Sequence, residues 1–298
     1  MSLSMTLVRQ VFKLRPGALS SDSALRQSVA SARPATALPP TLSRSHRYSR
    51  ECIGGFEVVT LRPVTATDAT PHLVYLHGGA YVNPLIGAHW SLIAAIMRRV
   101  DVTVTVPMYP LAPAHTIDDA LEFLDEVTPA HQHLNTPALV LCGDSAGGGL
   151  ALSYAPHQRD TGRRPAAALV LFSPWVDVTM TNPAIPELEE RDPILYAAQA
   201  RTCGLWWAGS RDTADPAVSP LYADVAGLPP TQTFIGDHDI LLPDAQQLHH
   251  RILEAGGASR LTVAKGGFHV YVGVPWLPES RRALNHTADI IRSVQNGI

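Results

Sequence analysis

The chain has 298 residues, of which 46% are hydrophobic and only 16% are charged. This balance excludes an intrinsically disordered chain, because apolar side chains are plentiful and little charge opposes their collapse into a core. A formal net charge of −3 lacks the basic surplus that nucleic acids and anionic membranes attract. The longest apolar run, 166–172, is far shorter than the ~20 residues of a membrane span. We therefore expect no nucleic-acid partner and no stable membrane insertion.

Residues 1–50 are rich in Ser, Arg, Pro and Ala and do not follow a regular pattern. Leu7, Val11 and Leu14 share one helical face, so we predict a short amphipathic helix followed by a loose connection. Charges interrupt the apolar residues at the start, unlike the unbroken core of a secretory signal. The cysteines are far apart in the chain, at Cys52, Cys142 and Cys203. This spacing fits neither a disulfide framework nor a zinc site, and it favours a cytoplasmic location without a metal.

Short apolar strands alternate with helices after residue 55. The expected strands are 56–61, 72–76, 102–106, 138–142, 167–172, 231–235 and 261–264. The expected helices are 90–100, 116–127, 146–157, 245–255 and the last 20 residues. Thr116, with Asp119 three residues later, is expected to cap the second of these helices. Buried strands that alternate with helices favour an α/β fold with a mostly parallel sheet covered on both faces.

Residues 174–220 break this alternation with repeated prolines and with tryptophans. We interpret 176–215 as an insertion that covers the carboxyl edge of the sheet, with Trp206 and Trp207 in its core. Residues 1–50 are the expected partner of this insertion, because the sheet can begin at Phe56 without them. The alternative is a disordered tail, since the stretch 20–45 is rich in Ser and Pro. The predicted organisation is therefore an N-terminal cap segment, 1–50, and a catalytic domain, 51–298, that contains the cap insertion.

The strongest chemical signal is Gly143-Asp144-Ser145-Ala146-Gly147, a G-x-S-x-G sequence. It follows an apolar strand and opens a helix, which is the context of a nucleophile elbow. The residues two before and two after the serine must be very small in such a tight turn, and Gly143 and Gly147 satisfy this condition. The turn exposes the serine hydroxyl near the positive end of the helix dipole.

His77-Gly78-Gly79-Ala80 follows the strand 72–76. The tetrahedral intermediate of acyl transfer carries an oxyanion that needs preorganised N–H donors. We expect the backbone N–H groups of Gly78 and Gly79 to supply two donors and that of Ala146 to supply a third. His77 is expected to anchor this loop and not to act as a base.

Two further loops follow the last two predicted strands. One contains Asp237 and Asp239, with Asp244 close behind, and the other ends at His269. The order serine, acid, histidine along the chain is the order found in α/β-hydrolases. His269 follows a glycine pair directly after a strand, whereas His249 and His250 lie within a predicted helix.

Together these motifs resemble the hormone-sensitive-lipase-like family of esterases and lipases in the α/β-hydrolase superfamily, over about residues 55 to 290. The resemblance also rests on the segments 109–113, 173–175 and 215–221. One departure is visible where the family's Y-R-L-A-P-E motif has Pro110 and Ala114 in place of Arg and Glu. The resemblance implies an eight-stranded, mostly parallel sheet with a helical cap.

The family implies that Ser145 is the nucleophile, that His269 is the base and that Asp239 orients the histidine, with Asp237 as the second candidate. Asp144 and His77 would support the loops. We expect a cofactor-independent enzyme that hydrolyses small, fairly apolar acyl esters, and a homodimer is possible. A lactone hydrolase or an amidase would use the same residues. A ligand receptor on an inactive hydrolase scaffold belongs to another class, but it would be expected to lack His269.

Overall fold

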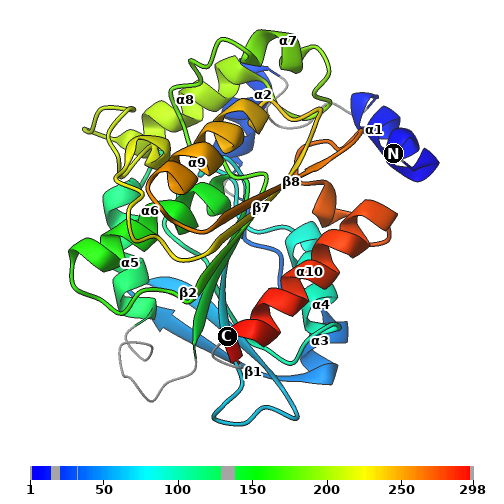
Figure 1. Ribbon diagram of the computed structural model, residues 1–298, viewed down its shortest axis with the longest axis vertical. Coiled ribbons are helices and arrows are strands. Elements are labelled where there is room, and N and C mark those ends of the chain that lie inside the picture. The colour runs from blue at the N-terminus through cyan, green and yellow to red at the C-terminus, as the bar shows by residue number, and fades with distance from the viewer. Residues whose placement is uncertain (1, 15–20, 32, 129–137, 296–298) are drawn as a thin grey trace.

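The computed structural model describes residues 2–14, 21–31, 33–128 and 138–295. Within them, eight strands form a single sheet in the order β1-β2-β4-β3-β5-β6-β7-β8 (Figure 1). The strands are β1 (His46–Ile53), β2 (Phe56–Pro63), β3 (His72–Leu76), β4 (Thr103–Pro107), β5 (Leu139–Asp144), β6 (Ala168–Phe172), β7 (Thr231–Gly236) and β8 (Ser259–Ala264). β2 runs antiparallel to β1 and β4, and the remaining neighbours are parallel. The predicted fold is confirmed.

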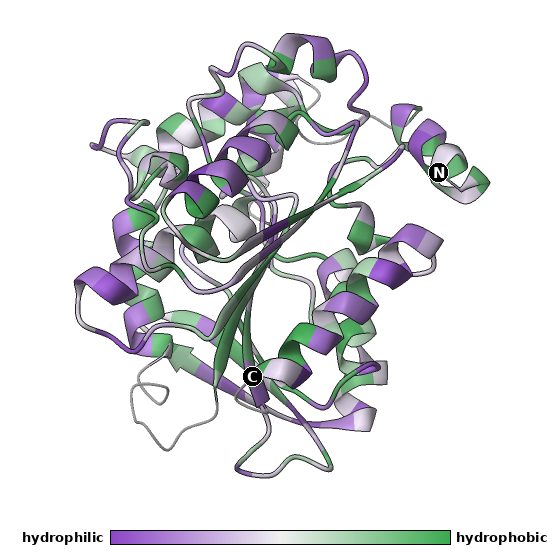
Figure 2. Cartoon of the chain, viewed as in Figure 1, coloured by the Kyte–Doolittle hydropathy of each residue, from purple (hydrophilic) through white to green (hydrophobic). Residues whose placement is uncertain are grey.

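Helices cover both faces of the sheet, and each face has its own apolar core. The helices of one face are α5 (Ile117–Val127), α6 (Ala146–Asp160) and α9 (Leu242–Glu254), and those of the other are α4 (Gly87–Met97) and α10 (Pro278–Gln295). The central strands are apolar along their length, whereas the helices carry polar residues on their outer sides (Figure 2). The Thr116 cap of α5 is confirmed, because Asp119 accepts the Thr116 N–H at 2.7 Å.

The sheet begins earlier than the sequence indicates. β1 pairs with β2 along its whole length, from His46 to Ile53, so the expectation that the first strand starts at Phe56 is wrong. The boundary between 50 and 51 therefore cuts through a strand. β1 lies at the edge of the sheet, and none of its residues is buried. A strand without a buried face has no alternation of polar and apolar residues by which to recognise it.

The described residues of the N-terminal segment form three helices, where one was expected: α1 (Leu3–Lys13), α2 (Asp22–Ala30) and α3 (Pro40–Ser45). The predicted apolar face of α1 is exposed, with Leu7 at 66% and Leu14 at 82%, so it does not pack on the insertion. α1 instead buries Met5, and its Phe12 ring lies 5.1 Å from that of Phe268.

α2 provides the contact with the insertion. Its Leu25 is 1% exposed and belongs to the core shared with α5 and α6. Gln199 of the insertion donates to Asp22 at 2.8 Å. The insertion itself contains α7 (Ile185–Glu189) and α8 (Ala197–Ala208), and a short 3-10 turn, η2 (Pro220–Tyr222), follows it. Trp207 is fully buried, as expected, and its ring stacks on Tyr81 at 4.2 Å.

No helix among the described residues is long and apolar enough to cross a bilayer. 

The burial of Leu25 generates a test of whether the N-terminal segment is part of the folded core. Leu25→Ala should lower the free energy of unfolding by about 2–5 kcal/mol, because it removes buried methyl groups and leaves a cavity. Leu7→Ala, in the exposed face of α1, should change it by less than about 0.5 kcal/mol. Urea unfolding of both variants measures the difference. Equal stabilities would show that α2 contributes nothing to the core.

Candidate active site

Ser145 occupies a sharp turn between β5 and α6. Its backbone has φ of 51° and ψ of −122°, a left-handed conformation that a non-glycine residue adopts only under constraint. Its N–H donates to the carbonyl of Phe172 at 2.9 Å, which holds the turn against β6. A Cβ on Gly147 would lie 2.1 Å from the carbonyl oxygen of Leu76, and one on Gly143 would lie 2.3 Å from that of Gly147. Both glycines are therefore required by the close approach of the backbones.

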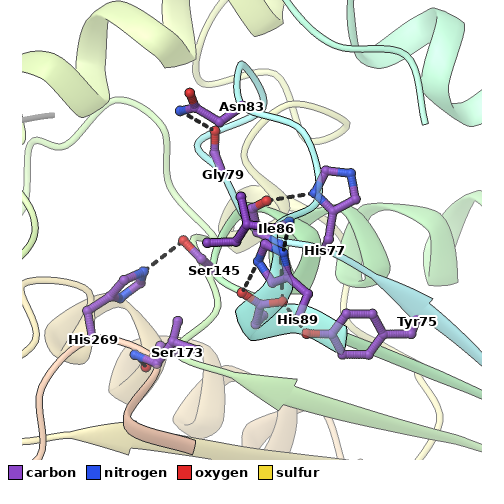
Figure 3. A network of polar contacts seen from close by, with 12 residues as sticks. Tyr75, His77, Gly79, Asn83, Ile86, His89, Ser145, Ser173 and His269 are labelled. Carbon is purple, nitrogen blue, oxygen red and sulfur yellow. Dashed lines mark hydrogen bonds and ion pairs between the residues drawn. The ribbon is translucent and has the colours of Figure 1, made fainter. Parts of the chain in front are cut away.

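A chain of hydrogen bonds joins Ser145 to His269 and Asp239. The Ser145 Oγ lies 2.8 Å from His269 Nε2, and the two side chains point toward each other (Figure 3). His269 Nδ1 lies 2.9 Å from Asp239 Oδ2. Because a carboxylate only accepts, Nδ1 carries the proton and Nε2 is free to accept from the serine hydroxyl. His269 is 7% exposed and Asp239 is fully buried, so little water competes for these bonds.

The other candidate acids make different contacts. Asp237 Oδ1 accepts the N–H of Gly266 at 2.6 Å and lies 2.7 Å from His238 Nδ1. Asp244 accepts from Asn182 at 2.7 Å, and burial raises its pKa to about 6. Neither carboxylate is bonded to His269, so the structure brings Asp239 to the histidine and leaves the other two outside.

Asp144, next to the serine, binds three separate segments of the chain. Its Oδ1 accepts from the Tyr75 hydroxyl and from the Gly78 N–H, and its Oδ2 lies 3.5 Å from His89 Nε2. The Ile86 N–H donates to His89 Nδ1 at 2.9 Å, so Nε2 carries the proton that faces the carboxylate. Burial would raise the pKa of Asp144, but His89 and the hydrogen bonds outweigh burial and hold it below its usual value.

The contact with Asp144 corrects the expected role of Gly78. Its N–H donates to Asp144 at 3.1 Å and is not available to a substrate oxygen. Gly78 is needed for another reason, since a Cβ there would lie 2.4 Å from Asp144 Oδ2. Within the described residues, no hydrogen bond is donated by the backbone N–H groups of Gly79, Ala80 and Ala146. These three are the donors that remain near the serine, and Ala80 was not expected.

His77 lies behind this loop and faces away from Ser145 (Figure 3). Its Nδ1 donates to the carbonyl of Gly78 at 2.7 Å, and its ring stacks on Tyr109 at 4.5 Å. Burial, followed by the proximity of His89, lowers the pKa of His77 to about 4. A neutral, stacked imidazole of this kind fits the expected anchoring role.

A largely apolar cavity of about 610 Å³ opens over Ser145 and His269. The N-terminal segment and the insertion both contribute to its walls, as do the loop after β3 and α4. The lining residues of the first two groups are Phe12, Ser28, Arg33, Pro34, Thr36, Ile194, Leu195 and Ala200. Trp206 and Trp207 do not line it, whereas Trp175 does.

Two polar residues near the histidine were missed by the sequence analysis. Ser173 Oγ accepts the N–H of Val270 at 2.9 Å, and both residues have positive φ, at 48° and 51°. The second is Asp192, which is 6% exposed. The sequence analysis noted Ser173 only within the segment 173–175 and gave it no role, and the sole signal for Asp192 was its neighbouring proline, which marks a turn but not its position in space.

Asp192 connects the insertion to the segment that carries Asp239. Its Oδ1 accepts the N–H groups of Ile194 and Leu195 at 2.8 and 3.1 Å. Its Oδ2 accepts the N–H of Ile240 at 3.0 Å. Burial, and then the charge of Asp239, raise the pKa of Asp192 to about 6.

No group of three His, Cys, Asp or Glu side chains is arranged to hold a metal ion in the described ranges. 

Comparison with known proteins matches residues 73–273 to a family described by the α/β hydrolase fold. An acetyl-hydrolase of Streptomyces hygroscopicus is 30% identical over 248 residues, which cover 80% of this chain and 82% of the relative. An esterase of Acinetobacter venetianus is 28% identical over 239 residues, covering 76% of each chain. The crystal structure of an esterase from the bacterial hormone-sensitive lipase family superposes with a TM-score of 0.79. It is 26% identical and covers 99% of this chain and 98% of its own.

The charges around His269 generate a prediction about its titration. Burial lowers the pKa of His269, but the charge and hydrogen bond of Asp239 outweigh burial, and Asp192 and Asp144 raise it further. The net pKa therefore lies above the usual 6.5. Asp192→Asn removes one of the negative charges that favour the imidazolium, so the pKa of His269 should fall. NMR titration of the imidazole measures this shift.

Glu189→Gln is the matched control for this titration. Glu189 also lies in the insertion and accepts a backbone N–H, that of Ala197 at 2.6 Å, but it is not among the groups that shift His269. Its substitution should leave the pKa of His269 unchanged. An unchanged pKa in Asp192→Asn as well would show that Asp192 has no electrostatic influence on the histidine.

Proposed function

The chain belongs to the hormone-sensitive-lipase-like esterases and lipases of the α/β-hydrolase family. On this premise we propose that it is a serine carboxylic-ester hydrolase that forms an acyl-enzyme. Ser145 is the nucleophile, His269 the general base and Asp239 the residue that orients the histidine. The observation that carries this proposal is the unbroken chain of hydrogen bonds from Ser145 Oγ through His269 to Asp239.

The first half of the reaction transfers the acyl group to Ser145. Nε2 of His269 takes the hydroxyl proton while Oγ attacks the ester carbonyl carbon, and the imidazolium then protonates the leaving alcohol. In the second half, His269 takes a proton from water, the water oxygen attacks the acyl carbon, and the imidazolium returns the proton to Ser145 Oγ as the acid is released. Asp239 stays ionised throughout and stabilises the imidazolium by its charge.

Backbone N–H groups stabilise the negative charge that develops on the carbonyl oxygen. Gly79, Ala80 and Ala146 are the proposed donors, because their N–H groups are uncommitted and flank the serine. Ala146 is the first residue of α6, where the helix dipole adds positive potential. Gly78 acts indirectly, since its bond to Asp144 holds the loop in place. Such donors typically contribute a factor of ~10² to 10³ each to kcat.

The cavity supports small, fairly apolar acyl esters as the substrates. Its walls come partly from residues 1–50 and from 176–215, which is consistent with the proposed role of both segments as a cap. The similarity to proteins named acetyl-hydrolase and esterase points the same way. A homodimer and a cytoplasmic location stay predictions.

Substitution of Ser145 tests the nucleophile. Ser145→Ala should fold normally and lose ~10³-fold or more in kcat towards p-nitrophenyl butyrate, because the three residues act as a unit. A fluorophosphonate should label the wild type at Ser145 and leave the variant unlabelled, as read by mass spectrometry of the peptides. Hydrolysis that persists in the variant, or labelling at another serine, would contradict the assignment.

A pair of aspartates in the same loop tests the acid. Asp239→Asn should cost about 10⁴-fold in kcat, because the amide favours the wrong histidine tautomer. Asp237→Asn is its matched control, since the amide oxygen can still accept the Gly266 N–H, and its kcat should stay close to that of the wild type. The reverse order of severity would assign the role to Asp237.

The choice of ester over related substrates is tested with a panel. An aryl ester, a lactone and an aryl amide of equal acyl length are compared by kcat/KM. The ester should be hydrolysed fastest. A higher kcat/KM for the lactone or the amide would replace the proposed substrate class, and no turnover of any of them would favour a receptor.

A further inference from the structure

A second cavity, of about 560 Å³, lies apart from the active site. It is bounded by α3, by the C-terminal end of α4 and by the start of α10, which lie on the same side of the sheet (Figure 1). Three arginines reach it: Arg98 and Arg99 from the turn that directly follows α4, and Arg281 from α10. Trp276, which is 55% exposed, forms part of its wall together with the neighbouring Pro275.

No side chain in the described part of the chain forms an ion pair with the arginines of this cavity. Within the described residues, no ion pair is recorded for Arg98, Arg99 or Arg281, and the acids of α10 pair with other arginines. Arg99 donates only to uncharged oxygens, those of Ala95 and Asn285. Burial lowers the pKa of Arg99, and the charges of Arg98 and Arg281 lower it further, which shows that the three cations repel one another.

Helix electrostatics explain only part of this cluster. Arg98 and Arg99 follow α4 directly, where cations interact favourably with the negative end of the helix dipole. Arg281 is the fourth residue of α10 and lies near the positive end of that helix, where a cation is unfavourable. An anion in the cavity would offset the repulsion between the arginines by pairing with them. It would also offset the unfavourable position of Arg281, because an anion near the N-terminus of α10 interacts favourably with that helix.

We propose that this cavity binds an organic phosphate, whose oxygens are held by Arg98, Arg99 and Arg281 and whose apolar part lies against Trp276. Three planar guanidinium groups can each engage oxygens in pairs, and a phosphate offers more oxygens than a carboxylate. The apolar walls from Pro39, Leu42 and Pro275 suit a phosphate that carries a chain or ring. A soluble phosphate ester and a phospholipid headgroup share this chemistry.

Calorimetric titration with phenyl phosphate at fixed ionic strength tests the site. The wild type should bind saturably, and Arg281→Gln should weaken binding by about tenfold or more, because a charge-assisted contact is lost. Arg282→Gln is the matched control: it is the next residue on α10, lies outside the cavity lining and should bind as the wild type does. Absence of saturable binding by the wild type, or equal affinity in Arg281→Gln, would overturn the proposal.

Thermal unfolding gives a second, independent readout. Without ligand and at low ionic strength, Arg281→Gln should unfold at the same or a higher Tm than the wild type, because repulsion between the arginines is relieved. At the same concentration, phenyl phosphate should raise the Tm of the wild type by more than that of the variant, because the variant binds it more weakly. A variant that is less stable without ligand and gains as much Tm as the wild type with phenyl phosphate would mean that Arg281 is merely structural. Unchanged hydrolysis of p-nitrophenyl butyrate verifies that the variants are folded.

Vesicles distinguish the two sources of the phosphate. An anionic lipid headgroup is identified if the wild-type protein sediments with phosphatidylglycerol vesicles but not with phosphatidylcholine vesicles, and if Arg281→Gln no longer sediments with either. Binding of phenyl phosphate without sedimentation would identify a soluble phosphate ester. Either result supports the site.

Discussion

The buried carboxylate of Asp144 is the contact on which the arrangement of the site depends. It receives hydrogen bonds from a strand and from the loop after that strand, through Tyr75 and Gly78, and a helix places His89 Nε2 3.5 Å from its other oxygen. A charge removed from water is tolerated only when such partners replace its hydration. Since Asp144 immediately precedes Ser145, the requirement to satisfy this charge also fixes the distance between the serine turn and the loop of proposed oxyanion donors. The close contact between this loop and the Asp144 carboxylate also requires glycine at position 78, because a Cβ there would clash with the carboxylate.

The walls of the active-site cavity come from segments that are distant in sequence and different in character. The N-terminal segment enters the core through Leu25 and the cavity through Phe12, whose ring packs beside Phe268. The insertion contributes Ile194 and Leu195, while Trp207 is buried behind the loop after β3. The cap proposed from both segments is therefore not a separate lobe, because its residues share the apolar core of the sheet.

The sequence was informative where local chemistry is strict. The serine turn needs glycine at two positions, the parallel strands need apolar runs, and a capping box needs Thr116 and Asp119, so each left a readable pattern. β1 left none, because an edge strand with exposed side chains has no buried face. The role of Gly78 was misjudged because a free N–H cannot be distinguished from a bonded one without knowing where Asp144 lies. Asp192 was missed because its contact with Ile240 joins distant parts of the chain.

The position of Asp192 has a consequence for how this enzyme can diverge. Its carboxylate holds the backbone of two cavity-lining residues with one oxygen and the segment next to Asp239 with the other. In the proposed mechanism, the shape of the cavity and the basicity of His269 are thus physically linked through one side chain. On the proposed function, exchange of the insertion between relatives, whether by recombination or by design, is expected to change the pH dependence of activity together with acyl selectivity. Retention of the aspartate and its three N–H partners would keep this link between the two properties unchanged.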